Sequence, residues 1–442
     1  MKKQSTWFIS VLGTNDYLPC NYFFYPRDKH KVDGVRFVQE AILRLLAQEE
    51  EMRPDEVVIF ATKGAYNANW KDDGHTDIDG KTLKRKGLKS CLKEACYSPK
   101  RQEIPEGKSE EEIWQIFQRI INSVPENVQL IVDITHSFRS LSMILLAAIQ
   151  YLKAVKNVEI AGIHYGALEA LGSLRDVQKM DKSERNVPIF DLTPFDAIMD
   201  WAKAAANFVE SGNSKALYEL SLNKINPILR QTKGRDEQAK QIRGFVDGLN
   251  KFCSNLATNR GPEISKSAQN VQNNLEKTKK TDLLPPLVPL FEKIEQELQG
   301  FDGDSLDVAV RTALWCLDHN FIPQGFTALQ EGIITWFLEQ INNKDILDVE
   351  TRDLVVSAFV ICNRSLRFEK WNKPSKNNVD LITRILEIDG FEQLAPIMDK
   401  LSQRRNNINH HGYNKDKVTP EVFKRDLKEV LDKIKKWKAS LK

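Results

Sequence analysis

The sequence has few of the features that mark secreted, membrane or cofactor-binding proteins. Its six cysteines are scattered and none forms a CxxC pair, which favours reduced thiols in the cytoplasm over disulfides or a structural zinc. The most apolar stretch, Met143–Leu152, is too short to span a membrane and is followed at once by Lys153. No GxGxxG motif follows the first apolar run, which argues against a dinucleotide cofactor. A net charge of only +3 argues against a protein that coats DNA.

The first 190 or so residues instead alternate short apolar runs with helical patterns. The runs with the length of a buried strand are Thr6–Leu12, Glu56–Thr62, Val128–Ile134 and Val158–His164. The helical patterns between them are Val32–Glu50, Ser109–Ser123 and Phe138–Lys156. This alternation predicts a parallel sheet with helices on both faces. The polar, lysine-rich segment Trp70–Gly107 is predicted to be an insertion or a long loop.

The character of the chain changes after Pro188, because helical stripes dominate from there to the C-terminus. Only Thr258–Thr281 is ambiguous, since it could be a flexible loop or a charged helix. The predicted fold class is therefore α/β plus all-α. We expect a Rossmann-like domain at residues 1–192, a helical linker region at 193–300 and a C-terminal helical domain at 301–442.

Polar residues gather where the predicted strands end. In open α/β sheets, ligands bind outside the carboxyl ends of the strands. Backbone N–H groups at the start of the helix after Asp133 would also face a ligand anion. The alternative is that Thr135 and Ser137 only cap that helix. The candidate ligand-binding residues are Gly13, Thr14, Asn15, Thr62, Lys63, Thr135, His136, Ser137, Arg139, Tyr165 and Gly166.

A second constellation lies near the C-terminus, in the segment Phe391–His411. Arg405 falls on the apolar stripe of a predicted helix, where an unpaired charge would be costly, and Asn406 and His410 share one face. Histidine can move a proton to or from the 2′-hydroxyl or the 5′-oxygen of RNA, and arginine can stabilise charge on the phosphorane. The plainer interpretation is a helix C-terminus with basic residues that complement its dipole.

These motifs resemble a known family. The segment Arg405–His410 (RNNINH) resembles the RN-x3-H form of the HEPN ribonuclease motif. The segments LGTNDY and DITHSFR, which begin at Leu12 and Asp133, resemble the CARF (CRISPR-associated Rossmann fold) domain. Together they are similar to the CARF–HEPN accessory ribonucleases of type III CRISPR systems.

The resemblance implies a cytoplasmic homodimer, or a higher oligomer, without cofactor or metal. Its CARF domains would bind a cyclic oligoadenylate, with cyclic tetra-adenylate the first choice and cyclic hexa-adenylate the second. Its HEPN domains would then cut single-stranded RNA in antiviral defence, leaving 2′,3′-cyclic phosphate ends. Arg405, Asn406 and His410 would be the catalytic residues. Arg404 and His411 leave the register open, because Arg404 with His410 and Arg405 with His411 also fit the spacing.

A dimer would make physical sense of this motif. Positions five apart on a helix diverge by about 140°, so one helix presents Arg405 and His410 poorly to a single phosphate, whereas two helices at a two-fold axis could combine them. The alternative function is a non-enzymatic nucleotide-sensing regulator with a helical nucleic-acid-binding region. A nucleotide-dependent metabolic enzyme fits less well, because no cofactor fingerprint is present.

Overall fold

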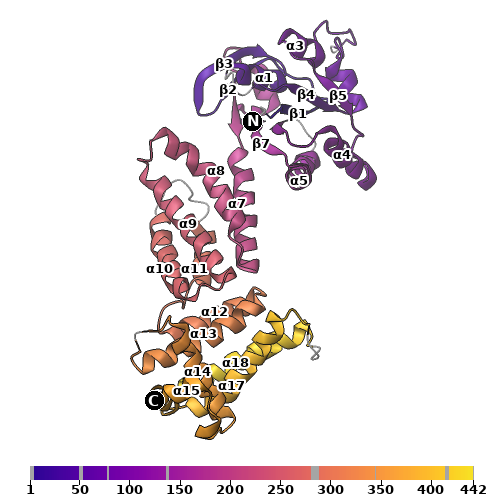
Figure 1. Ribbon diagram of the computed structural model, residues 1–442. Helices are drawn as coiled ribbons and strands as arrows, with labels where there is room; N and C mark the ends of the chain where they lie inside the picture. The colour runs from indigo at the N-terminus through magenta and orange to yellow at the C-terminus, as the bar shows by residue number, and fades with distance from the viewer. Residues whose placement is uncertain are drawn as a thin grey trace. The chain divides into compact units, whose positions relative to one another are not determined.

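The chain folds into two compact units, Met1–Ala197 and Ile198–Lys442. The computed structural model describes residues 4–48, 53–76, 79–135, 139–279, 288–343, 345–413 and 418–441 (Figure 1). Within these ranges, no helix is both long and apolar enough to cross a membrane. The predicted fold class, an α/β domain followed by helices, is confirmed.

The first unit is built on one mixed sheet, which in the described ranges has eight strands in the order β3-β2-β8-β7-β6-β1-β4-β5. The four predicted strands form its centre, and their continuous apolar sequences are those of strands buried on both faces. Neighbouring strands run parallel except at β2–β3 and β7–β8. The strands are β1 Thr6–Leu12, β2 Cys20–Phe24, β3 Arg27–Val35, β4 Glu56–Ala61, β5 Lys100–Glu103, β6 Gln129–Asp133, β7 Glu159–Gly166 and β8 Asn186–Asp191.

The prediction of a helix over Val32–Glu50 was wrong at its start. Residues Arg27–Val35 form β3, and helix α1 begins only at Val38 and ends at Gln48. The strand lies at the edge of the sheet. Val32 and Val35 are buried there while Asp33 is exposed, so the segment lacks the apolar run of a central strand.

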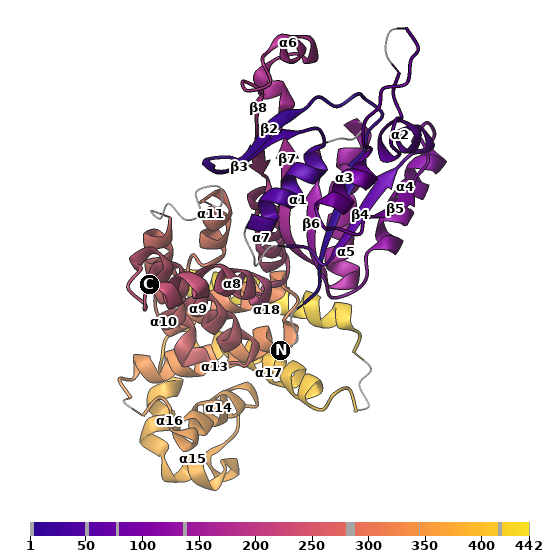
Figure 2. The same ribbon diagram turned by 90° about the horizontal axis from the view of Figure 1, so that it is seen from above.

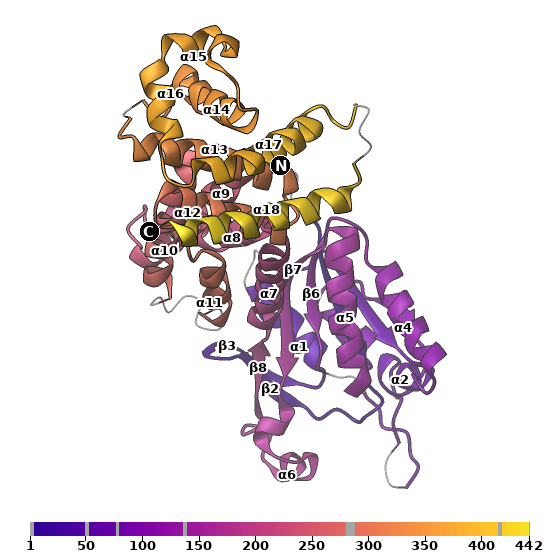
Figure 3. The same ribbon diagram turned by 90° about the horizontal axis from the view of Figure 1, so that it is seen from below.

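Helices cover both faces of this sheet. Helices α1 and α3 lie over one face (Figure 2), and α4 and α5 lie over the other (Figure 3). The segment Trp70–Gly107 is not a simple loop, because it contains helix α3 and the edge strand β5. The further helices of this unit are α2 Lys63–Ala65, α3 Leu88–Glu94, α4 Glu110–Ser123, α5 Arg139–Lys156 and α6 Leu174–Lys179, with a π-helix at Tyr66–Trp70 and a 3-10 helix at Leu168–Leu171.

The second unit is helical and contains two apolar clusters. One joins α7 to α11 with part of α12, and the other joins α12 to α18. The ambiguous segment Thr258–Thr281 is helical from Gly261 to Thr278. The helices are α7 Thr193–Ser211, α8 Lys215–Gln231, α9 Glu237–Ala257, α10 Gly261–Thr278, α11 Val288–Glu297, α12 Ser305–Asp318, α13 Ile322–Gln340, α14 Val349–Asn363, α15 Lys373–Asn377, α16 Val379–Leu386, α17 Phe391–Asn409 and α18 Pro420–Ser440. A 3-10 helix at Phe368–Lys370 follows α14.

Candidate functional site

The candidate ligand-binding residues follow four adjacent parallel strands, β7, β6, β1 and β4. Their carboxyl ends therefore lie along one edge of the sheet. Strands β4 and β5 lie on one side of β1 and strands β6 and β7 on the other, so the parallel part of the sheet has a switch point between β1 and β6. Such a point is where open α/β sheets bind ligands.

The loop after β1 lies against the loop after β4. Thr14 approaches Gly64, since a Cβ on this glycine would lie 3.3 Å from Cγ2 of Thr14. Thr62 is buried and caps α2, because its Oγ1 accepts a hydrogen bond from the N–H of Ala65 at 3.2 Å. Thr62 thus has a structural role at the start of α2. Asn15 and Lys63 are exposed at this edge.

The loop after β6 is tied to the end of β7 by Thr135. Its hydroxyl donates to Oδ1 of Asp133 at 2.6 Å and accepts from the N–H of Gly166 at 2.8 Å. Asp133 is buried, and its other oxygen accepts a hydrogen bond from Ser10 at 2.6 Å. Burial raises the pKa of Asp133, while the bonds from Ser10 and Thr135 favour its charged form. This network holds the carboxyl ends of β1, β6 and β7 together.

Other predicted ligand residues take different positions. Tyr165, next to Gly166, donates its hydroxyl to Glu169, and burial together with this partner raises its pKa to about 12. His136 and Ser137 lie outside the described residues. The backbone of Arg139 begins α5, but its side chain also lies outside the described part of the chain.

Sequence reasoning missed a polar cluster beneath the loop after β1. Asn69 is fully buried and donates to the carbonyls of Gly13 and Asn15 at 2.9 and 2.8 Å. His75 contacts Asn69, and Arg85 forms an ion pair with Asp16 at 2.6 Å. No local pattern marks these residues, because the insertion must fold back to bring them to the loop.

Arg36 adds a cation to the same cluster. Its guanidinium lies over the ring of Phe37 at 4.3 Å. Burial lowers its pKa, and the nearby charge of Arg85 acts in the same direction while that of Asp16 opposes it. Arg36 therefore adds a second guanidinium to this cluster beside the loop.

In the second unit, the two adjacent arginines of α17 have different partners. Arg404 donates from Nε to Oδ2 of Asp426 at 2.7 Å, and Lys400 lies 3.2 Å from the other oxygen of this carboxylate. Asp426 is only 2% exposed. Burial acts to raise its pKa, but Arg404 and Lys400 together outweigh it and lower the pKa of Asp426. Arg404 therefore ties α17 to α18.

Arg405 points elsewhere and forms an ion pair with Glu331 of α13, with Nη1 at 3.0 Å from Oε1. Arg352 holds the other oxygen of Glu331 at 2.8 Å. Asn406 and His410 are exposed, and the N–H of His410 donates to the carbonyl of Asn406 at 3.0 Å where α17 ends. The three predicted catalytic residues thus occupy the last two turns of one helix.

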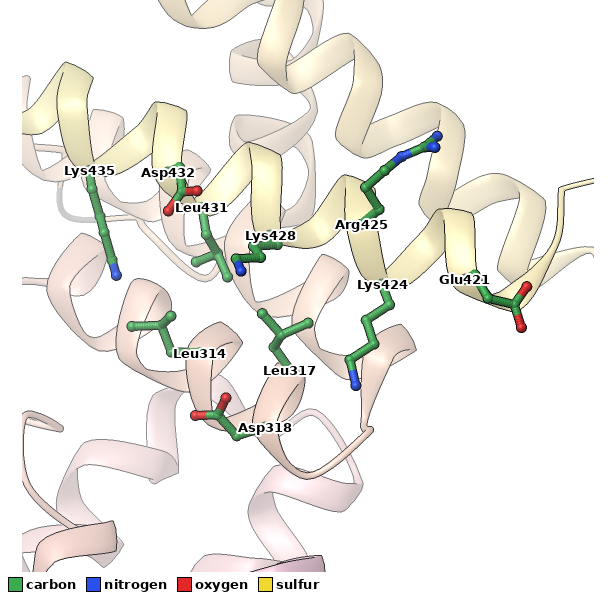
Figure 4. A pocket seen from close by; sticks show the side chains of 10 residues that line it. All are labelled: Leu314, Leu317, Asp318, Glu421, Lys424, Arg425, Lys428, Leu431, Asp432 and Lys435. Carbon is green, nitrogen blue, oxygen red and sulfur yellow. The ribbon is translucent and has the colours of Figure 1, made fainter.

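A groove of about 810 Å³ lies between α12 and α18 (Figure 4). Leu314, Leu317 and Leu431 provide apolar side chains, and Asp318, Glu421 and Asp432 add acidic ones. Lys424, Lys428 and Lys435 line it from α18, whereas Arg425 points away from α12. These three lysines form no ion pair within the described ranges. Over the same ranges, no group of three or more His, Cys, Asp or Glu residues is placed to hold a metal ion.

Comparisons with known proteins find matches for a large part of the first unit and for part of the second. Residues 7–169 match the model of the CARF domain of the CRISPR system endoribonuclease Csx1. Residues 197–301 match the model of the second domain of CRISPR-associated protein MJ1674. That protein, from Methanocaldococcus jannaschii, is 26% identical to this chain over 329 residues, which cover 72% of this chain and 47% of the relative. The match therefore spans about half the length of the relative. Over residues 7–169 the chain is thus similar to a CARF domain, and over most of its length it is similar to a CRISPR-associated protein.

Proposed function

We propose that this chain is an endoribonuclease that a cyclic oligoadenylate activates and that cuts single-stranded RNA without a metal ion. The observation that carries the proposal is the division of roles on α17. Arg404 is paired with the buried carboxylate of Asp426, whereas Arg405 is paired with the more exposed Glu331, and Asn406 and His410 are exposed. This division favours Arg405 over Arg404 as the catalytic arginine. The matched family model bears the name of an endoribonuclease, which agrees with such an activity.

The chemistry needs only groups that α17 supplies. The 2′-oxygen of RNA attacks the adjacent phosphorus, and the bond from phosphorus to the 5′-oxygen breaks. His410 takes the proton from the 2′-hydroxyl or gives one to the leaving 5′-oxygen, and a water molecule carries the proton of the other transfer. Arg405 stabilises the extra negative charge on the phosphorane. Asn406 orients either Arg405 or His410. The products are a 2′,3′-cyclic phosphate and a 5′-hydroxyl.

The active form is a homodimer. Arg405 and His410 diverge by about 140° around α17, so two copies of the helix are needed to surround one phosphate. Helices α4 and α5 carry exposed apolar side chains that a second copy would cover, with Met143 74% exposed and Trp114 57% exposed. This α4–α5 face consists of Trp114, Met143, Leu146, Tyr151 and Val155. Its two helices are joined by the edge-to-face contact of Phe117 on α4 with Tyr151 on α5, and Phe117 also contacts Trp114 within α4.

The activator binds at the carboxyl edge of β7, β6, β1 and β4. Cyclic tetra-adenylate is the first choice and cyclic hexa-adenylate the second. The proposed contacts are Gly13, Thr14, Asn15, Thr62, Lys63, Thr135, His136, Ser137, Arg139, Tyr165 and Gly166. A ligand that prefers one arrangement of the two protomers would shift the population toward the cleaving form.

The α12–α18 groove is the proposed path of the RNA backbone. Arg404 and Asp426 place the start of α18 beside the end of α17, and Lys424 and Lys428 lie within one turn of Asp426 on another face of α18. Lysines without a carboxylate partner can neutralise phosphates, which makes RNA binding depend on salt.

The test is cleavage of end-labelled single-stranded RNA in EDTA, with and without each cyclic oligoadenylate. We expect activator-dependent cleavage by the wild type and its loss in both Arg405→Ala and His410→Ala. Cleavage that survives in both variants would overturn the site assignment. RNA binding without turnover under every condition would instead support the non-enzymatic regulator.

A further inference from the structure

Asn69 uses all its polar atoms on the loop after β1 and on His75. Its Nδ2 donates to the carbonyls of Gly13 and Asn15 at 2.9 and 2.8 Å, so both amide hydrogens are committed. Its Oδ1 can only accept, and it lies 2.9 Å from Nε2 of His75. Nε2 must therefore carry the hydrogen. Burial lowers the pKa of His75, which favours the neutral ring with this tautomer.

These bonds fix the direction of two peptide groups. In a trans peptide the C=O and the following N–H point in opposite directions across one plane. Since the carbonyls of Gly13 and Asn15 point at Asn69, the N–H groups of Thr14 and Asp16 point away from it. Both residues are exposed, and among the described residues neither N–H has a hydrogen-bond partner. The loop thus presents two outward donors, as anion-binding loops do.

The charges around the loop suit an anion as well. The Asp16 carboxylate would repel a phosphate, but Arg85 pairs with it at 2.6 Å. Arg85 is itself held in place, since its N–H donates to Oδ1 of Asp73 at 2.8 Å. Tyr17 fixes the other side of the loop, because its hydroxyl accepts from the N–H of Gly13 at 2.8 Å.

We propose that Asn69, held by His75, is a positioning residue that sets the loop so that the N–H groups of Thr14 and Asp16 bind one phosphate of the cyclic oligoadenylate. The insertion Trp70–Gly107 is thereby part of the sensor, since it supplies His75 and the Arg85 that neutralises Asp16. This inference rests on the proposed function. Fixing the loop before binding lowers the ordering cost that the ligand would otherwise bear.

The test measures binding of cyclic tetra-adenylate and of cyclic hexa-adenylate to the full chain by calorimetry. Asn69→Asp keeps the shape of the side chain but loses both donors. We expect it to weaken binding of the preferred ring by about tenfold or more, at least as much as Asn69→Ala does. The matched control is Asn67→Ala, because Asn67 is exposed in the same π-helical turn and should leave affinity unchanged. RNA cleavage at saturating activator should change little in all variants, which separates positioning of the ligand loop from general damage.

Three outcomes are distinguishable. If the wild type binds neither ring, the proposed function fails and this inference falls with it. If the wild type binds and Asn69→Asp binds equally well, the positioning role is wrong while the proposed function stands. If Asn69→Asp does not fold, His75→Ala decides, because His75 is only half-buried and we expect about threefold weaker binding. Unchanged affinity in that variant would overturn the positioning role of Asn69 and His75.

Discussion

The two adjacent arginines of α17 should respond differently to the same substitution. Arg404→Ala removes one of the strong partners of Asp426, whose side chain is 3% exposed. Loss of a partner from a buried ion pair costs about 3–5 kcal/mol, but Lys400 remains and Arg404 is partly exposed, so we expect about 1–2 kcal/mol. In a unit of this size that lowers Tm by roughly 2–8 °C. Arg405→Ala removes an ion pair with the well-exposed Glu331, which stabilises by less than about 1 kcal/mol.

Calorimetric melting and RNA cleavage of both variants separate these roles. We expect Arg404→Ala to melt earlier yet cleave at a temperature where it is folded. Arg405→Ala should melt within about 4 °C of the wild type and be inactive. The converse pattern, with an unaltered Tm and no activity in Arg404→Ala and full activity in Arg405→Ala, would show that Arg404 is the motif arginine.

Three further outcomes are expected. Burial lowers the pKa of His164 to about 4, so the unfolded chain binds a proton between about pH 6.5 and 4 that the folded chain does not. The free energy of unfolding, measured by urea titration, should therefore fall by about 2 kcal/mol from pH 7 to pH 5. His164→Leu should lack this decrease. An equal pH dependence in both proteins would refute the role of His164. Replacing Lys424, Lys428 and Lys435 together by alanine should reduce the slope of log K against log salt for single-stranded RNA by about 2, and an unchanged slope would contradict the proposed RNA path. Met143→Asp should give monomers in sedimentation, whereas a retained dimer would exclude the α4–α5 face as the interface.

The central strands were predictable because each is buried on both faces and reads as a continuous apolar run. The hairpin β2–β3 was not, since of residues 30–35 in its edge strand only Val32 and Val35 are buried, three residues apart. The pattern after Val32 therefore merged with that of α1 and predicted one long helix. Edge strands have this weakness generally, because half of their side chains meet solvent.

The candidate sites were predictable in part. The strand ends at Leu12, Ala61, Asp133 and Gly166 follow from the rule that parallel strands share a carboxyl edge. Asn69 and Arg85 could not be found, because their importance depends on an insertion that returns to a loop more than fifty residues earlier in the chain. The register of Arg404 and Arg405 was also beyond local patterns, since Asp426 lies on the next helix.

The most direct measurement is the chemistry of the RNA ends. Mass spectrometry of fragments formed in EDTA with the preferred cyclic oligoadenylate should find 2′,3′-cyclic phosphates and 5′-hydroxyls, and no fragments from His410→Ala. Fragments with 3′-hydroxyl and 5′-phosphate ends, or cleavage that needs an added metal ion, would contradict the account.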